Sequence, residues 1–169
     1  MLLNSFNLIL SIVIATCLVI LQETMSNMFW LITIDMPVTI GIFLNTYFSN
    51  LFLMNLGGAI PIIALIAIGF LVAYLVTKIL LIWVNLSKSY AYALAGAAAI
   101  LAIVLLMPLA FYNLDVLAGG RSFLGKSILV FFGLISGYYF GNSLEKERVN
   151  NNFKISNSKI DEIIKINLN

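Results

Sequence analysis

The stretch that decides the fold is Ile60 to Trp83, IPIIALIAIGFLVAYLVTKILLIW, in which Lys78 is the one charged residue. A bilayer core about 30 Å thick needs about 20 consecutive apolar residues of α-helix, so this stretch can cross with some tilt. Lys78 lies near its end, where the side chain can reach the headgroups. Trp83 occupies a position where interfacial aromatic residues are enriched. The sequence therefore predicts a transmembrane helix here.

The composition of the whole chain also indicates a membrane protein. Its 169 residues are 62% hydrophobic and 9% charged, with a mean hydropathy of +1.08. A soluble domain is typically about 25% charged and about 45–50% apolar. So few charged residues cannot form a soluble surface, and the apolar side chains must therefore face lipid.

Three further apolar segments are candidates for membrane spans. Gln22 and Glu23 bound the first of them, and the positively charged start of a signal peptide is missing. We therefore expect this segment to remain as an uncleaved first span. The predicted fold class is an all-α integral membrane protein, with a membrane domain over residues 1–141. Its bundle of four transmembrane helices is predicted over residues 6–21, 60–83, 90–112 and 123–140.

The segment from Met28 to Asn55 allows two interpretations. After Pro37 its polar residues cluster on one side of a helix, which favours a helix lying in the membrane interface; these are Thr39, Asn45, Thr46, Ser49 and Asn50. The competing interpretation is a fifth span over residues 29–48. That span would bring Asp35 into the membrane at a cost of up to about 2.5–3.5 kcal/mol. We favour the interfacial helix.

The basic residues predict the orientation. Seven of the nine lie on one side of the predicted membrane: Lys78, Lys88, Lys146, Arg148, Lys154, Lys159 and Lys165. Basic residues near span ends collect on the cytoplasmic side. We therefore predict a multi-pass protein of the cytoplasmic (inner) membrane with both termini in the cytoplasm and residues 28–55 outside. A fifth span would reverse only the N-terminus.

A phosphate-binding motif occurs between the last two predicted spans. Residues 120–127, GRSFLGKS, match the P-loop pattern G-x-x-x-x-G-K-[ST]. A P-loop follows a buried strand and opens a helix within an α/β sheet, whereas this match lies between two membrane helices on the predicted outer side. We predict that the chain binds no nucleotide. We also expect no nucleic-acid partner.

Small residues form a regular pattern on the last span. Gly125, Gly133, Gly137 and Gly141 share one stripe, and the third span offers the row Ala91, Ala95, Ala99 and a second row of Ser89, Ala93 and Ala97. Small residues four apart let helix backbones approach closely in lipid. We expect the glycine stripe to pack these two helices together within one chain. Self-association or docking on another membrane subunit is the alternative.

Residues that support chemistry are scarce. The chain has no histidine and one cysteine, Cys17, so metal, haem and histidine-based catalytic sites lack their ligands and bases. Within the predicted spans the charged residues are Lys78 and Lys126, both near span ends. We predict no catalytic site, no metal site and no cofactor.

The remaining segment, residues 142–169, is predicted to be a cytoplasmic tail. Asn150 to Asn152 suggest a flexible linker, and Ser158 to Leu168 have the pattern of a short amphipathic helix. That helix has three expected states: bound to the inner leaflet, bound to a partner, or disordered. The sequence as a whole favours a non-catalytic accessory, structural or assembly subunit acting through helix packing. The alternative is a channel or transporter component for a small solute.

Overall fold

The computed structural model describes residues 2–57, 61–84, 86–110 and 117–167. Within them the chain forms the helices α1 (Leu2–Thr33), α2 (Ile40–Leu56), α3 (Ile62–Trp83), α4 (Lys88–Ala110) and α5 (Phe123–Asn167), with a short 3₁₀ turn η1 (Ala118–Gly120) before α5. Four of them, α1, α3, α4 and α5, are long and apolar enough to cross a membrane. The predicted all-α membrane bundle is confirmed.

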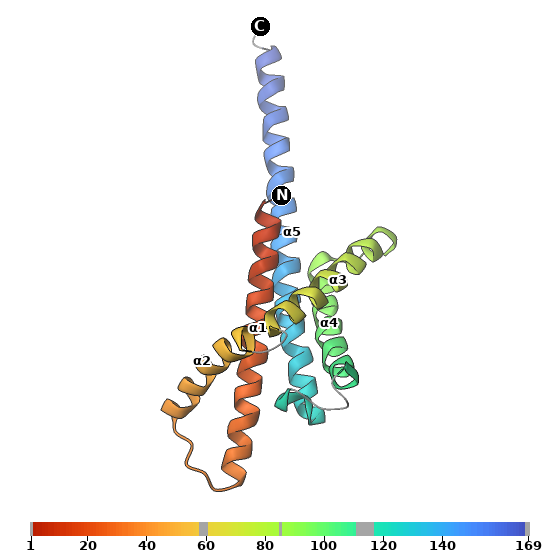
Figure 1. Ribbon diagram of the computed structural model, residues 1–169. Coiled ribbons are helices and arrows are strands. Elements are labelled where there is room, and N and C mark those ends of the chain that lie inside the picture. The colour runs from red at the N-terminus through yellow and green to blue at the C-terminus, as the bar shows by residue number, and fades with distance from the viewer. Residues whose placement is uncertain (1, 58–60, 85, 111–116, 168–169) are drawn as a thin grey trace.

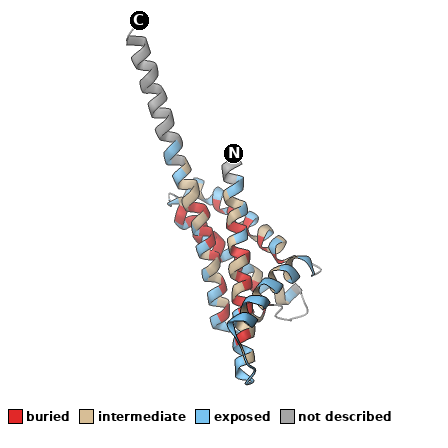
Figure 2. Ribbon diagram, turned by 90° about the vertical axis from the view of Figure 1, so that its left-hand side faces the viewer, coloured by how far each residue is buried: buried red, intermediate tan, exposed pale blue. Residues whose placement is uncertain are grey.

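The bundle is organised around α5 (Figure 1). Helices α1 and α4 run antiparallel to α5, whereas α3 crosses the group at a steep angle. The N-terminal end of α1 and the C-terminal end of α5 lie at the same end of the bundle in both views, and α5 extends far beyond it (Figures 1 and 2). An even number of crossings produces this arrangement of the chain ends.

The core lies where α1, α3, α4 and α5 face one another (Figure 2). Its largest fully buried apolar side chains come from all four helices: Ile20, Ile66, Phe70, Ile100 and Leu129. The outward surfaces carry exposed leucine, isoleucine and phenylalanine side chains. An apolar outer surface is what a bundle surrounded by lipid requires.

The first helix is longer than the sequence predicted. It passes through Gln22 and Glu23, which are both buried, and ends at Thr33. The chain then turns at Asp35, whose φ of 57° lies in the left-handed region. The amide of Met36 donates to the Leu31 carbonyl and that of Asp35 to the Ile32 carbonyl, as in the Schellman ending of a helix.

The segment from Met28 to Asn55, which allowed two interpretations, forms the end of α1, a turn and most of α2. A single span over residues 29–48 does not form, because the chain turns between Thr33 and Ile40. Thr39 caps the start of α2 by accepting from the Ile42 amide. Two side chains tie the helix to α1: the Tyr47 hydroxyl donates to the Cys17 carbonyl, and the Asn50 amide donates to the Thr24 hydroxyl.

The other predicted boundaries shift as well. Helix α4 begins at Lys88 and ends at Ala110; Phe111 and Tyr112 lie outside the described residues. Helix α5 continues through Asn150 to Asn152, so the expected linker before a separate short helix is absent from the fold. Extending a helix that is already long avoids the cost of a new nucleus, and each asparagine costs less than about 0.7 kcal/mol relative to alanine. Leu168 lies outside the described residues.

Candidate functional site

The glycine stripe of α5 lies against the backbone of α4. A Cβ atom on Gly133 would stand 2.5 Å from the Gly96 carbonyl oxygen, and one on Gly141 would stand 2.7 Å from the Lys88 carbonyl oxygen. At Gly137 it would overlap the Tyr92 carbonyl oxygen. No side chain fits at these three positions, because the obstacle in each case is backbone. This direct backbone contact is the closest approach that two membrane helices can make.

Gly96 of α4 completes this contact from the opposite side. A Cβ atom there would overlap the Gly133 carbonyl oxygen and lie 3.1 Å from the Gly137 Cα. The sequence analysis did not single out Gly96, because it lies within an alanine-rich run and outside both alanine rows. The sequence did contain a signal for it: Gly96 lies four residues after Tyr92 and four before Ile100, so the three residues share one side of α4. Tyr92 and Ile100 also contact α5.

The two small-residue rows of α4 face different neighbours. Ser89 and Ala93 supply backbone atoms against Gly141 and Gly137 of α5. The row Ala91, Ala95 and Ala99 instead lines the side of α4 that faces α3. The structure thus places the second row, rather than the first, against the glycine stripe.

The fourth stripe residue, Gly125, contacts the turn before α5 instead of α4. A Cβ atom on Gly125 would overlap the Gly119 carbonyl oxygen. The η1 turn is held from the other side by Glu23 of α1. Its carboxylate accepts from the Ala118 amide at 2.9 Å and from the Gly119 amide at 3.2 Å. This pair of hydrogen bonds gives the buried carboxylate partners inside the protein, which explains why α1 continues past it.

The segment that matches the P-loop pattern forms the start of α5. Gly120 ends η1, and Ser122 caps α5: its hydroxyl accepts from the Gly125 amide and its carbonyl from the Lys126 amide. Ser127 donates to the Phe123 carbonyl within the same helix. A membrane helix, α4, comes before this segment among the described residues, where a P-loop would follow a strand.

A cluster of hydroxyl groups joins three helices in the core. The Ser11 hydroxyl of α1 lies 3.1 Å from the Tyr74 hydroxyl of α3 and 3.0 Å from both side-chain and carbonyl oxygens of Ser136 of α5. Ser136 donates in return to the Ser11 carbonyl. Each hydroxyl has one proton, so the consistent arrangement is Tyr74 donating to Ser11, Ser11 to the Ser136 carbonyl, and Ser136 to the Ser11 carbonyl.

Aromatic rings surround this hydroxyl cluster. The rings of Tyr74 and Phe140 are stacked with centroids 4.7 Å apart, and Tyr92 meets both of them edge to face at 5.2–5.3 Å. The Phe70 ring also packs against Tyr74, with centroids 5.2 Å apart. These rings fill the space where α3, α4 and α5 meet, and the sequence analysis did not single them out.

The arrangement provides packing and hydrogen bonding within the protein. Among the described residues, no buried side-chain nitrogen or oxygen lacks a hydrogen-bond partner. In the same part of the chain, no group of three Asp, Glu, His or Cys side chains lies close enough to hold a metal ion. No family model, no curated protein and no solved structure matches this chain. The interpretation of the site therefore rests on its geometry.

Proposed function

We propose that this protein is a non-catalytic structural or accessory subunit of a membrane assembly. The observation that carries the proposal is the hydrogen bonding of the core. The Tyr74 hydroxyl donates to the Ser11 hydroxyl, and Ser11 and Ser136 each donate to the other's carbonyl. The hydroxyls of Thr16, Thr24 and Thr77 donate to carbonyls of their own helices. Groups that bind a substrate or pass a proton keep free donors or acceptors for it, whereas these groups are all engaged within the fold.

The exposed part of the α1–α2 hairpin, residues 25–56, supports the same proposal. It carries large apolar side chains that are more than half exposed: Phe29, Trp30, Ile40, Phe48, Phe52 and Leu56. No residue of α2 is buried. Apolar surface of this extent marks contact with a membrane or with another protein, and a subunit needs such a surface because the glycine stripe is used within the chain.

The proposal is tested by isolating a tagged full-length protein in a mild detergent and identifying what accompanies it by mass spectrometry. We expect a membrane protein in fixed stoichiometry, lost when Phe48 and Phe52 are both replaced by alanine. The matched control replaces Leu105 and Leu109, which are exposed on α4, and should keep the partner. Recovery of the tagged protein alone, at a monomer's mass, would contradict the proposal.

The break between α2 and α3 favours the second candidate, a channel or transporter component. The Asn55 side chain bridges the break by donating to the Leu51 carbonyl and accepting from the Ile63 amide. Broken helices accompany substrate sites in many transporters. Flux of a small solute into vesicles that contain this protein alone would favour this candidate over the subunit.

We also propose an orientation: the protein lies in the cytoplasmic (inner) membrane with both termini in the cytoplasm. A reporter fused after Asn150 should be active in the cytoplasm, because seven of the nine basic residues lie on that side. A cysteine introduced at Asn45 or Ser49, both exposed on α2, should react with an impermeant reagent from outside. An externally active reporter would reverse the orientation.

A further inference from the structure

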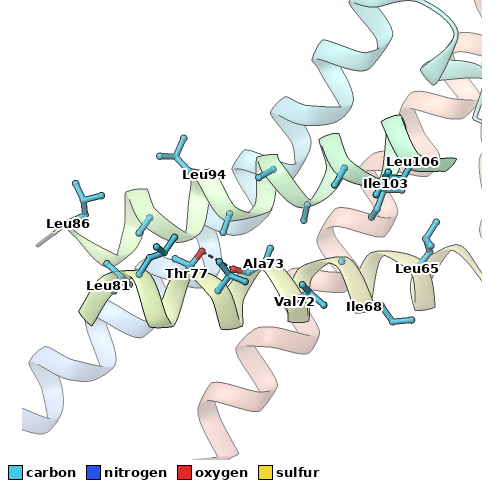
Figure 3. A pocket seen from close by; sticks show the side chains of 18 of the residues that line it. Leu65, Ile68, Val72, Ala73, Thr77, Leu81, Leu86, Leu94, Ile103 and Leu106 are labelled. Carbon is cyan, nitrogen blue, oxygen red and sulfur yellow. Dashed lines mark hydrogen bonds between the residues drawn. The ribbon is translucent and has the colours of Figure 1, made fainter. Parts of the chain in front are cut away.

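A long groove separates α3 from α4 on the outside of the bundle (Figure 3). It has a volume of about 1000 Å³ and runs from Leu65 and Leu106 at one end to Leu86 at the other. Within it Gly69 of α3 lies close to the Ile103 side chain of α4, and on the core side the rings of Tyr74 and Tyr92 join the same two helices. A volume of this size is at the upper end of the range for ligand pockets, about 300–1,000 Å³.

The walls of the groove are apolar along their whole length. Small residues of α4 form the floor, namely Ala91, Ala95, Ala98, Ala99 and Ala102. Among the described residues of the lining, Thr77 has the lone polar side chain, and its hydroxyl donates to the Ala73 carbonyl at 2.8 Å, as the dashed line in Figure 3 shows. The rims, which include Val72, Leu94 and Leu106, are exposed. Since α3 and α4 both span the membrane, the groove opens sideways into hydrocarbon.

One end of the groove lies at the headgroup level. Trp83 at the end of α3 is 87% exposed and Tyr90 at the start of α4 is 69% exposed. Exposed tryptophan and tyrosine at helix ends mark the interface of a bilayer. Leu86, between these two aromatic residues in the sequence, lines the groove at this end.

Lys88 supplies a positive charge at the same end. It stands three residues before Ala91 and seven before Ala95, so it shares the groove face of α4. Among the described residues it forms no salt bridge; the nearby carboxylate of Glu145 accepts from the Ser89 hydroxyl at 2.6 Å. Neither lysine is part of the groove lining. Lys88 lies beyond the end of the lining, on the same side of α4 as the alanines, whereas Lys78 is exposed on the side of α3 that faces away from the groove.

We propose that the α3–α4 groove binds an anionic phospholipid with two acyl chains. The chains lie against the alanine floor, and the phosphate lies at Lys88. The groove supplies what such a lipid requires: an apolar slot within the hydrocarbon, open to the side from which lipid arrives, with a cation at the headgroup level. This binding site is independent of the subunit role proposed above.

A second copy of the chain fits the groove less well. A copy docking through the same face would bring α3 or α4, and neither helix contains an acidic residue to meet Lys88. The lining residues that the structure describes also offer no free polar side chain for a hydrogen bond between helices. Bulky side chains of α3 such as Ile68 and Val76 stand along the rim. Flexible acyl chains follow such an irregular surface better than a rigid helix does.

The test measures lipid retained by the full-length protein. The protein, purified in detergent and depleted of lipid, is incubated with phosphatidylglycerol, with phosphatidylcholine of the same two chains, or with single-chain lysophosphatidylglycerol. Bound lipid is counted by native mass spectrometry. We expect one phosphatidylglycerol per chain, with several-fold weaker retention of the zwitterionic and single-chain lipids.

Two pairs of variants connect retention to the groove. Ala98→Phe fills the groove from an exposed position on its floor and should abolish retention, whereas Leu105→Phe, exposed on α4 outside the groove, should not. Lys88→Gln should remove the preference for phosphatidylglycerol over phosphatidylcholine, and Lys78→Gln should leave it intact. If Ala98→Phe lowers the melting temperature, Val72→Phe fills the groove from the exposed rim of α3 and takes its place.

Three results would overturn the proposal. One is equal retention by the groove-filling variants and Leu105→Phe. Another is equal loss of lipid preference in Lys88→Gln and Lys78→Gln. The third is a dimer that Ala98→Phe dissociates while lipid retention does not change, since a second copy would then occupy the groove.

Discussion

The two sides of α4 contact their neighbours in opposite ways. Toward α5, glycines on both helices bring the backbones together, so that a Cβ atom on Gly137 would overlap the Tyr92 carbonyl oxygen. Toward α3, a Cβ atom on Gly69 would lie 2.9 Å from Cδ1 of Ile103, the far end of a flexible side chain, and the outer side of the boundary is a groove. One helix thus forms a tight interface and a loose one.

The difference shows that small residues do not by themselves produce close packing. Both sides of α4 carry alanine or glycine at regular spacing. On the α5 side the neighbour is also glycine, so both surfaces are flat and the backbones meet. On the α3 side the alanines face valine, leucine and isoleucine of α3, and the two surfaces leave a space between them.

The largest effect is expected from Gly137→Leu. The new side chain has no room, because the obstacles are backbone atoms of Tyr92 and Ala93. Overpacking of this kind costs about 3 kcal/mol, the upper end of the usual range. The free energy of unfolding, measured by denaturant titration in micelles with circular dichroism, should fall by that amount. Gly41→Leu is the matched control, since nothing lies within 4 Å of a Cβ atom there; equal losses in both variants would remove the distinction between the interfaces.

Glu23→Ala should have the second largest effect, because it releases the η1 turn, which packs against α5, from its hydrogen bonds to α1. The substitution removes two charge-assisted hydrogen bonds to the Ala118 and Gly119 amides. We expect a loss of about 2 kcal/mol, within the range for hydrogen bonds to charged groups. Glu23→Gln keeps one acceptor and should lose less in the same unfolding titration. Unchanged stability of Glu23→Ala would show that η1 does not depend on this carboxylate.

Ser136→Ala tests the hydroxyl cluster between α5 and α1. It removes the donor to the Ser11 carbonyl, whereas the Ser11 hydroxyl keeps the backbone carbonyl of residue 136 as its acceptor. Hydrogen bonds between membrane helices contribute about 0.6 kcal/mol on average, so unfolding should become easier by about that amount. Thr77→Val, on α3, removes a bond to a carbonyl of the same helix and should change stability less. A larger loss of stability in Thr77→Val than in Ser136→Ala would contradict this prediction.

The smallest effect is expected from Gly69→Ala on the loose interface. The added methyl group displaces only the tip of Ile103, and alanine gains about 0.8–1.0 kcal/mol over glycine within a helix. Stability should stay the same or rise slightly. A loss as large as that of Gly137→Leu would mean that α3 packs as tightly as α5 does, and that the groove is not a permanent feature.

Much of the fold follows from the sequence. The apolar run from Ile60 to Trp83 fixes a membrane span because its length matches the hydrocarbon core, and the other three spans follow from the same comparison. The glycine positions of α5 are also visible in the sequence. These properties are local, since each depends on residues close together along one helix.

Other features depended on the tertiary structure. In the sequence, Gln22 and Glu23 looked like the end of the first span, because a charge in lipid is costly. The Glu23 carboxylate can be buried because it accepts hydrogen bonds from the η1 amides, which lie more than 90 residues away in the sequence. Ser11 and Ser136 are single hydroxyls with no sequence pattern to pair them. The sequence also could not show which row of α4 contacts the glycines, because the side chains of both rows are similarly small.

The sequence by itself determined that this is a helical membrane protein with four spans and a glycine face on the last one. Hydropathy and residue size act along each helix and need no knowledge of its neighbours. The tertiary structure alone decided which faces meet: glycines of α5 against the backbone of α4, Glu23 against η1, and a groove between α3 and α4. Those choices depend on how side chains of different helices fit together in three dimensions, and this fit is not encoded in any one segment.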